Sequence, residues 1–202
     1  MELLQNLSNV MQDFLLNQGI LGILISCAVI FVESIIPCMP LGVFITGIFY
    51  SYGTEYGLII CWLSTILGCM VSYNLCNKYI REFIENKFIK KLGKKSQKKI
   101  DHVINYIDNL SLSSLTLLVA CPFTPAFVLN IAAGLANVDK KKYLISLVVG
   151  KPFMIYFFGT IGTSLLESFN NPYIIIKVII MLFIAYVLSK VCDYIVKSKE
   201  EL

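Results

Sequence analysis

The sequence predicts an all-α polytopic membrane protein with about four spanning helices plus two opposed re-entrant helical segments, arranged as an inverted repeat. Hydrophobic residues make up 57% of the 202 residues and charged residues 15%, whereas soluble domains carry about a quarter charged residues. Several apolar runs approach the roughly 20 residues that span a bilayer. Two of these runs are interrupted by proline and glycine in corresponding halves, a pattern typical of transporter sites.

The N-terminal segment 1–19 is the first predicted element, an amphipathic helix with apolar residues at helical spacing. It either lies along the membrane surface or packs against the helix bundle, and the pattern is compatible with both. No basic residue precedes Lys78. The segment therefore lacks the positive region of a secretory signal peptide, and we expect no cleaved signal.

The membrane domain extends over residues 20–165, and its first half contains two uninterrupted apolar runs. These runs, 20–36 and 57–77, are predicted to span the membrane. The apolar segment between them, 37–53, contains two prolines and three glycines. It is too short and too interrupted to span, so we interpret it as re-entrant.

A basic helical hairpin is predicted at 78–109, where nine lysine and arginine residues fall between positions 78 and 99. The positive-inside rule places this hairpin in the cytoplasm and explains its charge. The same residues could bind anionic lipid headgroups at 78–99, and that alternative stays open. A nucleic-acid partner is not expected, because the positive-inside rule already accounts for the basic charge of a cytoplasmic loop.

A second interrupted segment, 112–135, has basic sequence on both flanks, the hairpin before it and Lys140 to Lys142 after it. A spanning segment would place one basic flank outside, whereas a re-entrant segment keeps both inside. We therefore expect it to enter from the cytoplasm and to face the protein interior. A spanning helix is predicted over 143–165, followed within 166–202 by a C-terminal spanning helix and a cytoplasmic tail. This topology places both termini on the cytoplasmic side of the plasma membrane.

Among the polar residues within the apolar segments, Glu33, Asn130 and Lys151 are the strongest candidates for a role at membrane depth. Glu33 either marks an ion, proton or headgroup pathway or is solvated at the interface. Lys151 either pairs with Glu33 or an anionic headgroup, or extends back to the cytoplasmic surface. Asn130 is expected to satisfy backbone groups that the prolines leave without partners.

Enzyme, cofactor and metal chemistry are not expected. The chain contains one histidine, His102, and its seven cysteines are scattered with no Cys-x-x-Cys spacing. No nucleotide-binding or hydrolase motif occurs. The cysteines are interpreted as small buried apolar residues rather than as disulfides or metal ligands.

The order of the proline, glycine and polar residues resembles the DedA family within the SNARE-associated Golgi protein (VTT-domain) superfamily. The resemblance covers about residues 20 to 165, and its second block is the more specific one. It is carried by Glu33-x-x-x-Pro37-x-x-Pro40, by Pro122-x-x-Pro125 followed by Asn130 and Gly134-Leu135, and by Gly150-x-Pro152 with Gly159.

The resemblance implies two opposed re-entrant helices and a role in lipid translocation, in some bacterial relatives coupled to the proton motive force. The transport-site candidates are Glu33, Pro37, Pro40, Pro122, Pro125, Asn130, Gly134 and Lys151. Relatives usually carry an arginine where this chain has Val119. We infer that Lys151, which lies between Gly150 and Pro152, could supply the missing cation.

The leading hypothesis is therefore an integral membrane translocator or scramblase-like protein for a polyprenyl phosphate or phospholipid. In this hypothesis lipid transport can be coupled to protons. Its expected partners are membrane lipids, among them lipid phosphates. One alternative is a proton- or cation-coupled carrier for a small solute. Another is a membrane scaffold that transports nothing and recruits partners through 78–109.

Overall fold

The computed structural model describes the central part of the chain, and the elements within it are all helices. This confirms the predicted all-α class. The described residues are 19–36, 41–80, 104–122, 124 and 126–168, with single residues and pairs between 176 and 190. The helices are α2 (Ile20–Ile35), α3 (Leu41–Leu75), the π-helical turn η1 (Cys76–Ile80), α6 (Leu112–Ala120), α7 (Ala126–Leu135) and α8 (Lys140–Ser168).

Two of the described helical stretches are long and apolar enough to cross a membrane, Leu41–Lys78 and Lys140–Leu166. The helices Ile20–Ile35 and Ala126–Leu135 are shorter and also apolar. The predicted N-terminal helix 1–19, most of the basic hairpin and most of the C-terminal segment 166–202 lie outside the described residues.

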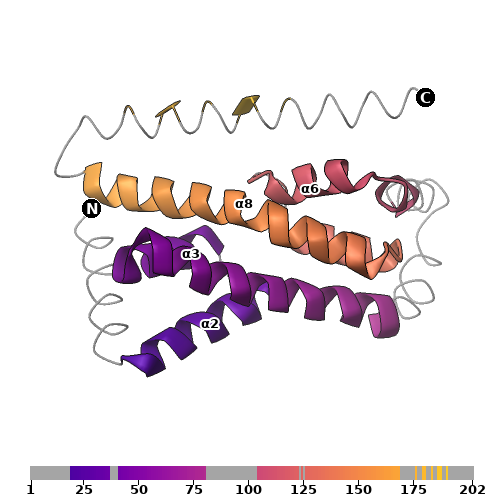
Figure 1. The fold of residues 1–202 in the computed structure, drawn as a ribbon, viewed down its shortest axis with the longest axis horizontal. Helices are drawn as coiled ribbons and strands as arrows, with labels where there is room; N and C mark the ends of the chain where they lie inside the picture. Colours follow the sequence, from indigo (N-terminus) through magenta and orange to yellow (C-terminus); the bar gives the residue numbers. More distant parts are fainter. Residues whose placement is uncertain are drawn as a thin grey trace, which may run out of the picture.

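The chain turns sharply at Gly53 inside α3. Gly53 has φ 79° and ψ 170°, which is not a helical conformation. A Cβ atom built on Gly57 would lie 3.1 Å from Phe49 Cα. In an uninterrupted helix these positions are more than two turns apart, so residues 41–52 fold back beside the start of the second half of α3, as Figure 1 shows. The turn falls where the interrupted segment 37–53 was predicted to end.

The turn gives the first testable prediction. The backbone of Gly53 occupies a region that is essentially closed to residues with a Cβ atom. We expect Gly53→Ala to lower the free energy of unfolding by about 1 to 2 kcal/mol. Thermal unfolding in detergent measures the effect, and Thr54→Ala at the next exposed position is the control. Equal stability of both variants would contradict a turn that requires glycine.

The second half contains a shorter helix pair with defined ends. Ser111 caps α6 by accepting a hydrogen bond from Ser114 N at 3.2 Å. The chain leaves α6 at Cys121, directly before Pro122, and re-enters a helix at Ala126. α7 ends in a Schellman motif, in which Val138 N donates to Ala133 O and Asn137 adopts φ 56°.

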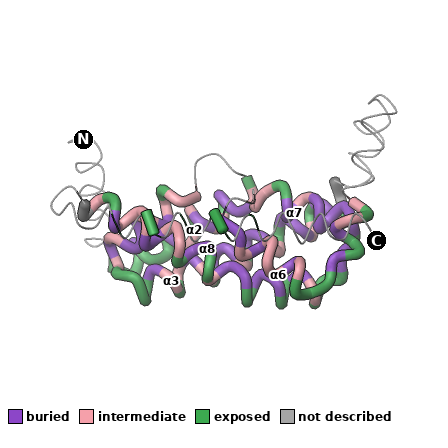
Figure 2. Tube along the Cα trace, turned by 90° about the horizontal axis from the view of Figure 1, so that it is seen from above, coloured by how far each residue is buried: buried purple, intermediate pink, exposed green. Residues whose placement is uncertain are grey.

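α8 runs beside α3 on one side and α6 on the other (Figure 1), and α3 also packs against α2 and α7. Their buried apolar side chains form two separate clusters, and Figure 2 shows the buried positions running along the middle of the bundle. The α2–α3 cluster consists of Ile30, Ile45, Ile48, Phe49, Cys61 and Ile155. The α6–α7 cluster consists of Cys69, Tyr73, Ile107, Leu110, Leu115, Val119, Leu129, Ala132, Ala133, Ala136, Val138, Tyr143 and Leu147.

Candidate functional site

The two apolar clusters are separated along α8 by a lysine. Leu147 belongs to the α6–α7 cluster and Ile155 to the α2–α3 cluster. Lys151 lies one turn from each and is 2% exposed. Because residues four apart share a helix face, the lysine occupies the junction between the clusters. A lysine at membrane depth costs about 2.5 to 3.5 kcal/mol on insertion scales, so its position requires an explanation.

The same alternation occurs on α3, where a threonine separates the clusters. Cys61 belongs to the α2–α3 cluster, Cys69 to the α6–α7 cluster, and Thr65 lies one turn from each. Thr65 is fully buried, and its hydroxyl has no hydrogen-bond partner among the residues that the structure describes. Other hydroxyls in these helices donate to the carbonyl four residues earlier, as do those of Ser26, Ser34, Thr46, Ser51, Thr116, Ser146, Thr160 and Thr163.

Asn130 of α7 connects its own helix to three others. Its amide nitrogen lies 3.3 Å from Ser34 O of α2 and 3.3 Å from Cys69 Sγ of α3. Its amide oxygen accepts a 2.6 Å hydrogen bond from Tyr143 Oη of α8. Asn130 is 1% exposed, so these bonds form in the protein interior, where an unpaired amide would be costly.

Two tyrosines hold the α8 end of this network in place. The rings of Tyr73 and Tyr143 stack with centroids 5.0 Å apart. The Tyr73 hydroxyl donates to Val138 O at 2.6 Å, between α7 and α8. The orientation of Tyr143 toward Asn130 is therefore set by a neighbouring ring as well as by its own hydrogen bond.

Helix breaks in both halves leave carbonyls that side chains from other helices satisfy. Pro152 has no N–H to donate to Val148 O, and Trp62 Nε1 of α3 donates to that carbonyl at 3.1 Å. Ser34 O lies in the last turn of α2, where carbonyls lack helical partners, and receives the Asn130 amide. Asn130 thus contacts a backbone carbonyl of the opposite half, and its expected role toward carbonyls freed by the prolines stays a prediction.

Glu33 lies beside Ser34 in the last turn of α2 and is 8% exposed. It is therefore buried within the protein. We refer to five buried polar residues of α2, α3, α7 and α8 as the polar layer. They are Glu33, Ser34, Thr65, Asn130 and Lys151, of which Thr65 and Lys151 lie one turn from both clusters.

Of the two pairings suggested for Lys151, the one with Glu33 is not found in the described part of the chain, and the one with an anionic headgroup stays a prediction. The polar contact of the ammonium among these residues is with Met154 Sδ at 3.8 Å, rather than with the Glu33 carboxylate. A thioether is a weak acceptor for a charged donor. The side chain is also too buried to extend to the protein surface, because it remains packed inside the bundle.

The remaining candidates divide between described and undescribed positions. Pro122 is buried after α6, and Gly134 is buried in α7, where its helix lies against η1 and the end of α3. Pro37, Pro40 and Pro125 lie outside the described residues. In the described ranges, no group of three His, Cys, Asp or Glu side chains is placed to hold a metal ion.

Sequence reasoning missed Thr65, Tyr143 and Tyr73. The signal for Thr65 was available, since small and polar residues recur at helical spacing through the span 57–77, as at helix interfaces in membranes. Tyr143 follows three lysines, at the start of the predicted span 143–165. Its role depends on a contact with another helix, which its local sequence does not encode.

Comparisons with known proteins find similarity to membrane proteins. The chain is 25% identical to an uncharacterized membrane protein, YhjE of Bacillus subtilis, over 86% of this chain and 82% of that protein. It is 24% identical to an inner membrane protein of Borreliella burgdorferi, over 77% of this chain and 74% of that protein. No solved structure matches.

The model of the VTT domain family matches residues 36–164. This range is more than half of the chain and contains the turn at Gly53, the α6–α7 helix pair and every member of the polar layer except Glu33 and Ser34. The chain therefore belongs to the VTT domain family of membrane proteins.

Proposed function

We propose that this protein moves lipids with a phosphate-bearing headgroup between the leaflets of the membrane. The observation that carries the proposal is the polar layer, a set of buried polar side chains inside a bundle whose outer surface is rich in exposed apolar residues. Polar and charged residues at membrane depth typically belong to substrate or ion pathways. A headgroup could cross at this layer while the acyl or prenyl chain remains in the bilayer.

We further propose that segments 37–53 and 112–135 enter the membrane from opposite sides and return. The turn at Gly53, which places Phe49 beside Gly57, supports this for the first segment. The break between Cys121 and Ala126 supports it for the second. Helix ends that meet inside a membrane protein can present backbone dipoles to a charged group.

Glu33 is proposed to carry the proton that would couple transport to a gradient. We expect Glu33→Gln to abolish the stimulation of lipid translocation by a proton gradient, because the amide cannot exchange a proton. Translocation without a gradient should persist. The measurement is accessibility of a fluorescent lipid phosphate in proteoliposomes that contain purified protein, with and without an imposed pH gradient.

Glu55→Gln is the matched control, because Glu55 is an exposed carboxylate near the Gly53 turn. It should retain the wild-type response to the gradient. Wild-type stimulation in Glu33→Gln would remove Glu33 from the mechanism. Failure of folded wild-type protein to translocate lipid, combined with gradient-driven uptake of a small solute, would favour a solute carrier instead.

A further inference from the structure

We infer that Lys151 and Thr65 together form an anion-binding site that takes the phosphate group of the transported lipid. The inference rests on the proposed function and adds a position and a ligand chemistry to it. Two separate observations support it, one on α8 and one on α3, and both concern donors that the protein leaves available in its interior.

The first observation is the state of the Lys151 ammonium. Its side chain is 2% exposed, and its polar contact in the described residues is the thioether of Met154 at 3.8 Å. An ammonium has three protons to donate, and a buried charge is stable only when an acceptor or a counter-charge is close. A phosphate would supply both the negative charge and several acceptor oxygens.

The second observation is the Thr65 hydroxyl. Threonine in a buried helix commonly donates to the carbonyl four residues earlier, as Thr46, Thr116 and Thr160 do here. Thr65 does not do so, although it is fully buried. A hydroxyl that remains available beside an anion can donate one hydrogen bond to it.

The two donors belong to the same level of the bundle. Each lies one turn from both apolar clusters, on two helices that pack against each other. Trp62, one turn before Thr65, donates to Val148 O, one turn before Lys151, at 3.1 Å. Val148 is 38% exposed, so this edge of the layer reaches the outer surface of the bundle, where a lipid could approach.

The same contact provides a probe, because Trp62 is the only tryptophan in the chain. The experiment measures Trp62 fluorescence of the full-length protein in phosphatidylcholine nanodiscs as the fraction of phosphatidic acid increases. We expect a saturable change for the wild type, and none when phosphatidylcholine alone is varied. A parallel titration with inorganic phosphate in the buffer tests whether the site binds a free anion or requires a lipid headgroup.

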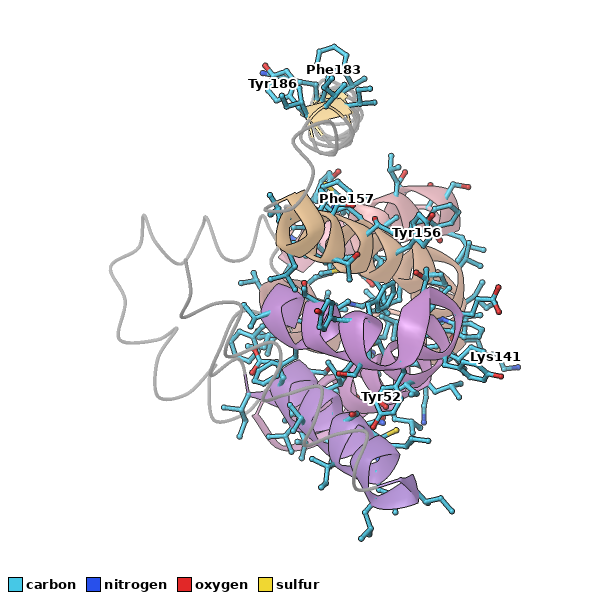
Figure 3. The ribbon with its side chains drawn as sticks, turned by 90° about the vertical axis from the view of Figure 1, so that its left-hand side faces the viewer. Tyr52, Lys141, Tyr156, Phe157, Phe183 and Tyr186 are labelled. Carbon is cyan, nitrogen blue, oxygen red and sulfur yellow. The ribbon has the colours of Figure 1, made fainter. Side chains whose placement is uncertain are left out.

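Lys151→Met should weaken the apparent affinity for phosphatidic acid by about tenfold or more, the loss expected for a charge-assisted hydrogen bond. Thr65→Val, which conserves shape, should weaken it by about threefold to tenfold. Lys141→Met is the control, because Lys141 is exposed on α8 and points away from the bundle in Figure 3. It removes the same charge and should bind like the wild type.

If Lys151→Met folds poorly, a second variant that moves the lysine to a neighbouring helix tests the same site. A Cβ atom on Gly150 would lie 3.0 Å from Val119 Cβ, so position 119 of α6 faces α8 next to Lys151. Val119→Lys in the Lys151→Met background returns an ammonium to the same level from another helix. Partial recovery of phosphatidic acid binding supports an electrostatic role, whereas a purely structural lysine would not be replaced in this way.

Each other outcome is informative. Unchanged binding in both Lys151→Met and Thr65→Val, or no saturable change in the wild type, would overturn the site. An equal response to inorganic phosphate would keep an anion site and overturn its assignment to a lipid. Phosphatidic acid binding without lipid translocation in proteoliposomes would leave the site standing and overturn the proposed transport function.

Discussion

Replacement of Asn130 by leucine is expected to lower the free energy of unfolding by about 3 to 4 kcal/mol, because buried partners left unpaired cost about 1 to 3 kcal/mol each. The leucine has a similar volume but leaves the Tyr143 hydroxyl without its acceptor and Ser34 O without its donor. The measurement is reversible unfolding of the purified protein in mixed micelles.

A double-mutant cycle with Tyr143→Phe separates the hydrogen bond from general disruption. Tyr143→Phe alone should cost about 1 to 2 kcal/mol, since it removes one buried donor and leaves the Asn130 amide oxygen without that hydrogen bond. The double variant should cost less than the sum of the two single variants, because the phenylalanine has no hydroxyl to leave unpaired. Additive losses would show that the 2.6 Å contact does not couple α7 to α8.

Gly134→Val is expected to lower the free energy of unfolding by about 3 kcal/mol, at the upper end of the cost of overpacking a core. A Cβ atom at this position would lie 2.9 Å from Tyr73 O and 2.7 Å from Cys76 Cβ. The carbonyl belongs to the backbone of α3 and cannot rotate away, so α7 itself must move. We therefore expect loss of the close packing between α7 and α3, and with it displacement of Asn130 from Ser34 O.

Val128→Leu is the control for this substitution, because Val128 lies on the same helix and is 56% exposed. The larger side chain at this exposed position should not displace neighbouring atoms, so the free energy of unfolding should match that of the wild type. Thermal unfolding of the two variants in the same detergent gives the comparison. A Gly134→Val protein as stable as the control would contradict the close approach of α7 to α3.

The sequence by itself was sufficient for the fold class and for most helix positions. Apolar run lengths predicted the helical bundle, because a bilayer requires long segments with internally satisfied backbone. Proline and glycine predicted the break in α3 near Gly53 and the break after α6, because both residues act locally on φ, ψ and hydrogen bonding. The sequence left open whether Glu33 and Lys151 lie in the interior or at the membrane interface, and the structure buries both.

The partners of those polar groups were decided by tertiary structure alone. Asn130 meets Ser34, 96 residues earlier, and Trp62 satisfies the carbonyl that Pro152 leaves free, across 86 residues. Such contacts depend on how helices cross and at which level, and no local pattern encodes either. For the same reason the sequence could not place the Lys151 ammonium beside Met154, where the structure has it, rather than beside Glu33. The sequence shows that residue 151 carries a charge, whereas the helices packed around it determine which acceptors its ammonium group can reach.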